Sequence, residues 1–433
     1  MADRLRVALA GLGTVGAGVV RLLDANAALI ERRAGRAIEV VAVSARDRTR
    51  DRGVDVARFD WVDDAQALAA RNDVDVVVEL VGGSDGPALT LARATFAAGK
   101  GLVTANKAMI AHHGLDLARA AEGAGVPLKF EAAVAGGVPV IKGLREGAAA
   151  NQVSRVYGIL NGTCNFILSK MEADGSDFAA VLKEAQALGY AEADPSFDID
   201  GIDAAHKLAI LASVAFGTVP AFGDVGAQGI AQVIAADIAE AAALGYRVRL
   251  VGMAEAGAEA DGGGLFQRVH PHLVPIAHPL AHVTGSTNAV VAEGDFVGRL
   301  FFQGPGAGAG PTASAVVADL IDIARGEWGP AFGMPATALT TGERADAGAR
   351  RGRAYLRFTV EDRVGVLAEI AAAMRDAGVS IESLIQRGTS GASGVVVTIV
   401  THDGPERCVA QALERLRGSQ SVIGQPMWMP ILA

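Results

Sequence analysis

The side chains best suited to chemistry are concentrated in one segment, GYAEADPSFDIDGIDAAHK at residues 189–207. The chain around it is 51% hydrophobic, so a charge cluster of this density is unusual for it. A lysine removed from water beside a carboxylate can exchange a proton near neutral pH. The segment therefore predicts proton transfer or recognition of a polar ligand. Its ionisable residues are Glu192, Asp194, Asp198, Asp200, Asp203 and Lys207.

The element that must position this cluster is a helix beginning near Ile202. The run IDAAHKLAILASVAF is rich in alanine and apolar residues, which predicts a largely buried helix. Asp200 is placed to cap it, because a short carboxylate can accept the free N–H groups of a first turn. Asp203 and Lys207 are four residues apart and share one helix face. If that face is buried, the two charges must pair with each other or with a polar ligand.

Two other interpretations of the acidic run remain open from the residues alone. An aspartate–lysine pair at this spacing is often a solvated helix pair, and an acidic run is often a polar loop. A calcium loop is the weaker alternative. Asp194, Ser196 and Asp198 have suggestive spacing, but glycine is missing at the sixth position and glutamate at the twelfth.

Length and composition narrow the class of protein. A chain of 433 residues predicts about two or three domains. A net charge of −9 argues against nucleic acid as a partner. Two cysteines without metal-ligand spacing fit a reducing compartment. The N-terminus lacks the pattern of a signal peptide, and no apolar stretch approaches the ~20 residues of a membrane span. We therefore expect a cytoplasmic protein without a membrane partner.

Alternating apolar strands and helices in the first 133 residues predict a Rossmann-type α/β domain with a parallel sheet covered on both faces. This region is expected to bind a dinucleotide and to be completed by residues 304–340. The expected strands are 5–10, 38–44, 74–80, 101–104 and 127–131, and the expected helices are 17–33, 87–98 and 114–124.

A glycine turn, GLGTVG, follows the first expected strand and precedes a helix. Gly11 permits the tight turn, Gly13 lets the backbone approach a pyrophosphate, and Gly16 lets helix and strand pack closely. The turn predicts dinucleotide binding, with a purely structural turn as the alternative. The second strand does not end in the acidic residue that usually indicates binding of NAD, and Arg46 could contact the 2′-phosphate of NADP. A solvated loop arginine is the equal alternative, so NAD and NADP both remain open.

The rest of the chain predicts two further domains. Residues 134–303 suit an α+β domain for substrate binding and dimerisation, with two strands across 287–302. The glycine-rich run 303–310 precedes a helix at 311–325, which predicts a return to the nucleotide domain, with a hinge as the alternative. Residues 341–353 suit a linker. Residues 354–433 predict a ferredoxin-like βαββαβ unit, with strands 354–360, 379–386, 394–401 and 421–429 and helices 365–377 and 405–416.

Six blocks in order resemble the homoserine dehydrogenase family, in its monofunctional form with a C-terminal ACT domain. The resemblance covers nearly the whole chain, and its tail VEDRVGVLAEIAAAMRDAGVSIESLIQ is similar to an ACT domain. The blocks are GLGTVG at 11–16, TANKA at 104–108, FEAAVAGGVPVI at 130–141, GILNGTCNF at 158–166, the segment 189–207, and NAVVAEGDFVGRLFFQGPGAGAGPTASAVVADL at 288–320.

The resemblance implies reversible reduction of L-aspartate 4-semialdehyde to L-homoserine by NAD(P)H, in threonine, methionine and isoleucine biosynthesis. It implies Lys207 as the general acid, with Asp203 orienting it. Glu192 and Asp198 resemble the substrate-binding carboxylates of the family. Lys107 resembles the lysine between nicotinamide and substrate, and it is a second candidate for proton transfer.

The resemblance also implies ligand contacts outside the acidic segment. Further coenzyme contacts carried over are Leu12, Thr14, Val15 and Gly304. A sodium ion is implied at a segment matching Glu131, Val134, Gly136 and Val138, and carbonyl oxygens suit such a hard cation. A homodimer or homotetramer is expected. The ACT domain implies threonine feedback, but Val364 stands where proline is common, so the domain could instead only mediate assembly.

Three alternatives compete with this function. Cys164 invites a phosphorylating semialdehyde dehydrogenase, although no histidine is indicated as the base it needs. A non-catalytic nucleotide or amino-acid sensor is disfavoured by the presence of both Lys107 and Lys207. A zinc site is disfavoured because the histidines stand among prolines and apolar residues; they are His270, His272, His278 and His282.

Overall fold

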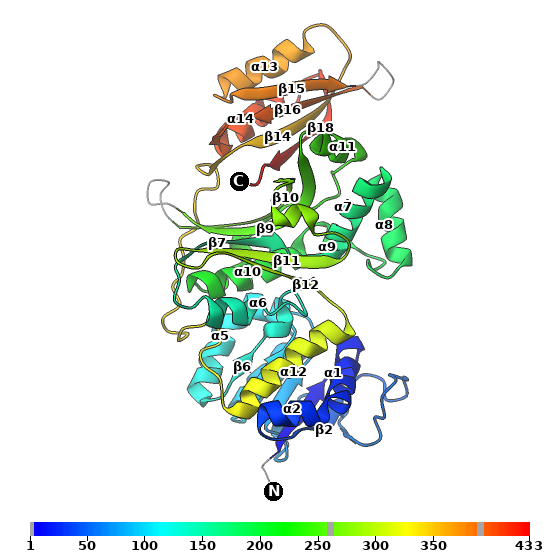
Figure 1. Ribbon diagram of the computed structural model, residues 1–433, viewed down its shortest axis with the longest axis vertical. Helices are drawn as coiled ribbons and strands as arrows, with labels where there is room; N and C mark the ends of the chain where they lie inside the picture. The colour runs from blue at the N-terminus through cyan, green and yellow to red at the C-terminus, as the bar shows by residue number, and fades with distance from the viewer. Residues whose placement is uncertain (1–3, 258–263, 388–393) are drawn as a thin grey trace.

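The computed structural model describes residues 4–257, 264–387 and 394–433, and its three larger sheets lie one after another along its long axis (Figure 1). The N-terminal sheet lies at one end, a mixed sheet in the middle, and the C-terminal sheet at the other end. Among these residues, no helix has the length and hydropathy needed to cross a bilayer.

The N-terminal sheet is parallel, with strand order β3-β2-β1-β4-β5-β6. This is the predicted doubly wound arrangement, in which ligands bind where the strand order reverses, between β1 and β4. The strands are short, and β1, β4 and β5 are almost wholly buried, as parallel strands covered on two faces must be. They are β1 Leu5–Ala10, β2 Ile38–Ser44, β3 Asp60–Trp61, β4 Val76–Glu79, β5 Gly101–Thr104 and β6 Leu128–Lys129.

The helices of this domain differ from the prediction at three points, the first of which is the short helix α3 (Ala67–Ala70), which the sequence does not predict. The expected helix over 17–33 is two helices that meet at Asn26. The helix expected from residue 114 begins at Lys107, because the Asn106 side chain accepts a hydrogen bond from the Met109 N–H and caps it. The helices are α1 Thr14–Ala25, α2 Ala27–Ala34, α3 Ala67–Ala70, α4 Pro87–Ala97 and α5 Lys107–Ala124.

Helix α12 (Ala309–Arg325) brings the chain back to this domain and packs against α1. Gly18 permits the close approach, since a Cβ there would lie 2.6 Å from the carbonyl oxygen of Ala309. The glycine-rich run before α12 therefore leads into a packed helix.

The middle sheet has the order β12-β11-β7-β9-β10-β8, antiparallel except for the pair β10–β8. Helix α10 (Ile202–Phe216) packs on β7, β9 and β10 with one side and on α5 with another, so it joins the two domains (Figure 1). The strands are β7 Val153–Ile159, β8 Gly226–Ala227, β9 Tyr246–Ala256, β10 Leu265–Pro275, β11 Thr287–Gly294 and β12 Gly298–Pro305.

The remaining helical elements lie around the middle sheet, where α7 and α11 pack on its interior strand β9, and at its junction with the N-terminal domain. They are η1 Glu131–Ala133, α6 Val140–Lys142, the π-helix η2 Gly143–Gly147, α7 Gly162–Asp174, α8 Phe178–Ala187, α9 Ser196–Ile199, η3 Phe222–Asp224, α11 Ala235–Ala243 and η5 Pro279–His282.

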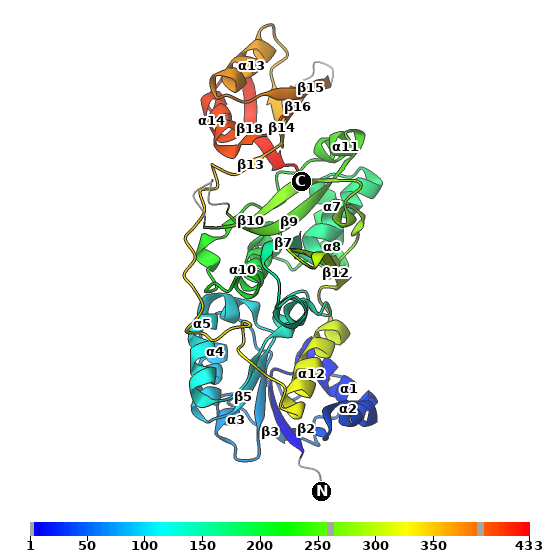
Figure 2. The ribbon, with the colours of Figure 1, turned by 60° about the vertical axis from the view of Figure 1, so that its left-hand side comes forward.

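The segment expected to be a linker runs along the side of the molecule and is attached to it (Figure 2). Thr340 forms a bridge with Thr218, and the N–H of Leu265 donates to the carbonyl of Glu343. Strand β13 (Arg351–Gly352) then pairs with β17 (Gly404–Pro405). These backbone contacts restrain the linker against the middle domain and the C-terminal unit.

The C-terminal unit is the predicted ferredoxin-like sheet, with strand order β15-β16-β14-β18. It docks on the middle domain through buried ion pairs. Glu406 binds Arg268 at 2.6 Å, and Arg357 binds Asp237 at 2.8 Å. The elements are β14 Ala354–Val360, α13 Val366–Asp376, β15 Ile381–Arg387, β16 Val395–Thr401, α14 Glu406–Leu416 and β18 Val422–Pro430.

The clustered histidines lie in separate environments. His270 and His272 are buried in β10, His278 contacts the hydroxyl of Tyr157, and His282 is exposed. Within the described part of the chain, no group of three or more histidine, cysteine, aspartate or glutamate side chains is placed to hold a metal ion.

We expect the contact between the middle domain and the C-terminal unit to be sensitive to acid, because the ring of His270 lies 5.2 Å from the ring of Trp428 in the C-terminal unit. Burial and the nearby Arg268 lower the pKa of His270 to about 4. The folded protein therefore binds this proton less readily than the unfolded chain, whose histidine titrates near ~6.5. The contribution of neutral His270 to the free energy of unfolding is fully present above pH ~6.5. It is lost as the pH drops towards 4, by about 3 kcal/mol at most.

Denaturant titrations across pH 4–7 would measure this effect. We expect His270→Phe to lose less stability over that range than the unsubstituted protein, whereas His402→Phe, at an exposed position, keeps the original slope. Equal slopes for all three proteins would contradict the assignment.

Candidate active site

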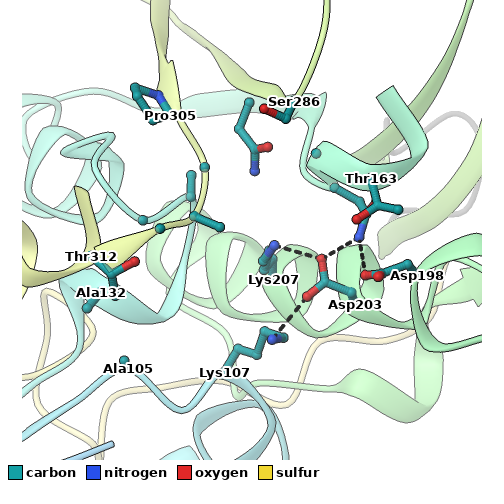
Figure 3. A pocket seen from close by; sticks show the side chains of 18 of the residues that line it. Ala105, Lys107, Ala132, Thr163, Asp198, Asp203, Lys207, Ser286, Pro305 and Thr312 are labelled. Carbon is teal, nitrogen blue, oxygen red and sulfur yellow. Dashed lines mark hydrogen bonds and ion pairs between the residues drawn. The ribbon is translucent and has the colours of Figure 1, made fainter. Parts of the chain in front are cut away.

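A pocket of about 560 Å³ opens where the N-terminal sheet, the return loop before α12 and helix α10 meet (Figure 3). Its lining includes Lys107, Asp198, Asp203 and Lys207, which are four of the predicted site residues. Val15 and Gly136 also line it, which places the glycine turn and the segment after β6 at the same cavity.

One buried carboxylate joins two lysines in this pocket. The Lys207 ammonium donates to Asp203 Oδ2 at 2.7 Å and to the carbonyl of Leu160 at 2.8 Å. The Lys107 ammonium lies 3.1 Å from Asp203 Oδ1. Asp203 and Lys207 are 4% and 9% exposed, so the solvated helix pair is excluded. Figure 3 shows the Lys207 and Lys107 ammoniums each facing a different oxygen of the Asp203 carboxylate.

The prediction that Asp200 caps α10 is wrong. The capping residue is Gly201, which has φ +85°, and no side chain accepts a hydrogen bond there. Asp200 ends the short helix α9 instead. A Cβ at Gly229 would lie 1.8 Å from the carbonyl of Ile199, so the chain is crowded where α9 turns into α10. The turn thus uses the left-handed conformation that glycine adopts freely.

The sequence interpretation missed Asn161, which organises the carboxylates. Its amide Nδ2 donates to Asp198 Oδ1 at 2.7 Å and to Asp203 Oδ2 at 2.9 Å. Its Oδ1 accepts from the N–H of Cys164 and caps α7. Asparagine before a helix is a recognisable cap signal. No local sequence pattern indicates that the amide nitrogen of the same side chain bridges two aspartates that are distant in the chain.

The charges of the cluster follow from burial and pairing. Burial opposes ionisation of Asp203, but the ammoniums of Lys207 and Lys107 and the hydrogen bond from Asn161 hold the pKa of Asp203 well below its usual range. Burial raises the pKa of Asp198 despite its hydrogen bond from Asn161. Asp203 is therefore anionic across the physiological range and compensates two cationic side chains.

Glu192 is not brought into this group. Its side chain is exposed, and the pocket lining contains its neighbours Gly189 and Tyr190 instead. The side-chain amide of Gln186 donates to the carbonyls of Glu192 and Ala193, which holds this segment at the rim.

The glycine turn separates the main pocket from a second one. Val15 lines the first pocket, whereas Gly11, Leu12 and Gly13 line the second, together with Arg46. Thr14 is exposed at the start of α1. The second pocket has a volume of about 490 Å³ and lies beyond the end of β2. An extended dinucleotide could therefore run from one pocket to the other across the turn.

Each turn glycine has the space its predicted role requires. Gly11 has φ +106°, and a Cβ there would lie 2.6 Å from the carbonyl of Leu80. A Cβ at Gly16 would lie 2.2 Å from the carbonyl of Gly11, whereas one at Gly13 would meet nothing within 4 Å. The turn is tightly packed on the protein side and open over the start of α1, where a pyrophosphate would sit. Gly304 lies in β12, one residue before the pocket-lining segment that starts at Pro305.

The segment implied to bind sodium is a buried turn beside the main pocket. Both carboxylate oxygens of Glu131 accept backbone N–H groups, from Ile141 and Lys142. Burial and the nearby Asp319 carboxylate raise the pKa of Glu131 to about 7. The Lys142 ammonium lies 3.6 Å from Asp319 Oδ1, and a further cation would offset the remaining charge of the two carboxylates. Gly136 at φ +50° shapes the turn that carries the candidate carbonyls. The oxygen donor set fits a hard monovalent cation.

Cys164 is a structural residue in this structure. It is 0% exposed, and its thiol donates to the carbonyl of Asp198 at 3.1 Å. Burial and the carboxylates of Asp198 and Asp203 raise its pKa well above the ordinary thiol value. A thiolate nucleophile is thereby disfavoured, which argues against the phosphorylating alternative.

We expect Cys164→Ala to keep most of the activity, within about threefold, because only packing and one weak hydrogen bond are lost. Steady-state kinetics with a thermal melt would check this. A loss beyond a hundredfold in a protein that melts normally would restore the thiol as a reacting group.

A doubly wound nucleotide domain, a glycine turn between two pockets and a lysine–aspartate cluster beside them define a nicotinamide-dependent oxidoreductase, and its C-terminal unit is an ACT domain. Family models match residues 11–131 (homoserine dehydrogenase, NAD binding domain), 139–321 (homoserine dehydrogenase) and 354–418 (ACT domain). The chain belongs to the homoserine dehydrogenase family. Membership implies NAD(P)-dependent reduction of aspartate semialdehyde in amino-acid biosynthesis from aspartate.

Individual relatives match over nearly the whole chain. The homoserine dehydrogenase of Pseudomonas aeruginosa is 44% identical, over 97% of each chain. The crystal structure of a homoserine dehydrogenase from Thiobacillus denitrificans is 41% identical, with a TM-score of 0.92 over 99% of this chain and 98% of the other. A hyperthermophilic archaeal homoserine dehydrogenase solved with NADPH is 26% identical, with a TM-score of 0.65 over 76% of this chain and all of the other.

Proposed function

We propose that this chain reduces L-aspartate 4-semialdehyde reversibly to L-homoserine, with Lys207 as the general acid. The observation that supports this assignment is the buried Asp203 carboxylate, paired with two lysine ammoniums in a pocket beside the glycine turn. The bound dihydronicotinamide supplies the hydride. Lys207 protonates the developing alkoxide oxygen, and Asp203 holds its ammonium in place.

The other charged groups suit the amino-acid part of the substrate. Asp198 is positioned by Asn161 and can hold the substrate ammonium. Lys107 can orient the substrate from the coenzyme side of the pocket, or share the proton transfer. Glu192 would join them only if the segment from Tyr190 turns inward, since its side chain is exposed in this structure.

We infer a preference for NADP from the second pocket. Strand β2 ends at Ser44 without a carboxylate, and Arg46 and Arg50 line the pocket that follows. The archaeal relative solved with NADPH is consistent with this choice. A guanidinium on a 2′-phosphate is a charge-assisted contact of about 1.5–3 kcal/mol.

We therefore expect Arg46→Asp to raise the KM for NADPH about tenfold or more and to leave the KM for NADH within twofold. Arg48→Asp is a matched control, because Arg48 lies in the same loop over the ring of Trp61 and outside the pocket lining. An equal effect on both coenzymes, or the same effect from Arg48→Asp, would contradict the assignment.

We further propose a sodium ion held by the Glu131 carboxylate and the backbone carbonyls of Val134, Gly136 and Val138. These oxygens belong to the segment between β6 and α6, next to the pocket. The ion would fix this segment against the return loop, where Gly136 and Gly306 pack so closely that a Cβ on Gly136 would lie 2.6 Å from the Gly306 carbonyl.

We assign threonine as the effector of the ACT domain, with assembly alone as the alternative. Gly365 caps α13 with φ +97°, and a Cβ there would meet nothing within 4 Å, which leaves room for a ligand.

Exposed apolar residues on the edge strand β12 and its turn support a homodimer or homotetramer; they are Phe296, Val297 and Phe301. We place the protein in the cytoplasm and divide it at residues 133, 303, 340 and 353.

One assay tests these proposals together. The oxidation of NADPH and of NADH is followed with aspartate semialdehyde, in sodium chloride and in choline chloride, with and without threonine. We expect rapid turnover with NADPH, a lower rate without sodium, and inhibition by threonine. Absence of turnover with either coenzyme would refute the proposed reaction. If threonine does not inhibit the enzyme, the remaining role for the ACT domain is to mediate assembly.

A further inference from the structure

Four rings pack together beside the Lys107 ammonium, and the reaction described above uses none of them. His206 lies in α10, one residue before Lys207, and stacks on Phe222 at 4.1 Å between ring centroids, nearly parallel. Phe197 stacks on His206 at 5.7 Å, and His112 of α5 contacts both His206 and Phe222. The rings come from four separate elements and meet at the junction of α5 and α10.

Lys107 is held from two directions. Its ammonium lies 3.1 Å from Asp203 Oδ1 and 5.5 Å from the centroid of the Phe197 ring. A lysine side chain has four rotatable bonds and loses much freedom when it is fixed, so one partner leaves it several orientations. The face of an aromatic ring attracts an ammonium. Phe197 therefore favours the orientations in which Lys107 stays at Asp203.

Phe197 needs support of its own. It is 42% exposed and stands on α9, a helix of four residues. The support comes from His206, which is 5% exposed and lies between Phe197 and Phe222. The stack Phe222–His206–Phe197 thus connects the buried face of α10 to the lysine on α5.

The stack requires a neutral His206. Nε2 of His206 and Nε2 of His112 lie 3.2 Å apart, so one ring donates and the other accepts. The charged groups facing His206 are Lys107 from α5 and Asp203 from its own helix. Burial, His112 and Lys107 together lower the pKa of His206 to about 4. His206 therefore adds no positive charge beside Lys107 at neutral pH.

We propose that Phe197, supported by His206 and Phe222, is a positioning residue that holds the Lys107 ammonium against Asp203 and towards the substrate. This inference rests on the proposed role of Lys107 in the reaction. It adds an aromatic residue to a site whose other named side chains are charged or polar.

The test compares Phe197→Leu, which removes the aromatic face, with Phe197→Tyr, which retains it. We expect Phe197→Leu to lower kcat about threefold, the size of a partly exposed cation–π contact, with an unchanged KM for NADPH. Phe197→Tyr should restore kcat. Trp328→Leu is the matched control, because Trp328 is an aromatic residue of similar exposure (44%) after α12 and outside the pocket lining, and we expect it to behave as the unsubstituted enzyme.

A second measurement reports on Lys107 without using activity. Acetylation by acetic anhydride is followed by mass spectrometry for Lys107 and for Lys183, an exposed reference. We expect Lys107 to react about threefold faster in Phe197→Leu and at the original rate in Phe197→Tyr. His206→Ala should also increase the rate. An unchanged Lys107 rate in Phe197→Leu would overturn the proposal even if the enzyme reduces aspartate semialdehyde, whereas an inactive enzyme with the expected labelling would overturn the reaction alone.

Discussion

Replacing Lys207 by alanine should lower kcat about a thousandfold while the coenzyme still binds. General acid–base catalysis by one placed group contributes about 10²–10⁴-fold, and Lys207 is the cation most deeply buried in the pocket-lining cluster. The glycine turn and the second pocket are built from other segments, so the dissociation constant for NADPH should stay within twofold. Stopped-flow reduction of aspartate semialdehyde and fluorescence titration of NADPH would measure the two quantities.

Lys207→Arg tests whether Lys207 contributes only its positive charge or also donates a proton. Arginine keeps the cation near Asp203 but stays protonated throughout the usable pH range. We expect it to lose at least a hundredfold in kcat as well. Lys170→Ala, at a half-exposed pair with Asp174 and Glu184, is the control that should retain full activity. Normal turnover by Lys207→Ala would remove Lys207 from the mechanism and leave Lys107 as the acid.

Replacing Asp203 by asparagine should cost both stability and activity. The carboxylate is 4% exposed and compensates the ammoniums of Lys207 and Lys107. Breaking a buried ion pair from one side costs about 3–5 kcal/mol, because the remaining charge stays buried without a partner. Lys107 is partly exposed, so the lower end of that range applies. We also expect kcat to fall at least a hundredfold, since Lys207 loses the group that orients it.

The pH dependence distinguishes a lost charge from lost packing. The pKa of Asp203 is depressed in the folded protein, so its stabilisation is present above the unfolded value of about 3.9 and is lost as the pH falls below it. Urea unfolding should show a constant difference between the two proteins from pH 8 to 5, which then narrows below about 4. Asp200→Asn is the matched control, at an exposed aspartate of the same segment. A difference that is independent of pH down to 3 would indicate packing instead.

The local elements around the site could be predicted because short-range patterns carry them. The strand 354–360 and the two strands across 287–302 alternate or cluster apolar residues clearly, and both appear in the structure. The glycine turn also lies where the sequence predicts it, between the first strand and the first helix, because a tight turn of this kind needs glycine for local steric reasons. The start of α5 was misplaced by seven residues because Asn106 caps it through a side-chain contact that periodicity does not reveal.

The composition of the site could be predicted only in part. Asp203 and Lys207 are four residues apart on one helix, so their pairing follows from the sequence. The contact of Lys107 with Asp203, the bridging amide of Asn161 and the exposed position of Glu192 all depend on how α5, α7 and the 189–201 segment pack together.

The sequence by itself therefore determined the order of the domains, the glycine turn and the helix that carries Asp203 and Lys207. These features depend on residues close together along the chain, whose periodicity and steric limits are local. Only the tertiary structure decided which distant side chains share the charge of Asp203, and that a phenylalanine stands against Lys107. Such contacts join segments that are far apart in the chain, and their energies depend on burial, which exists only once the domains have packed.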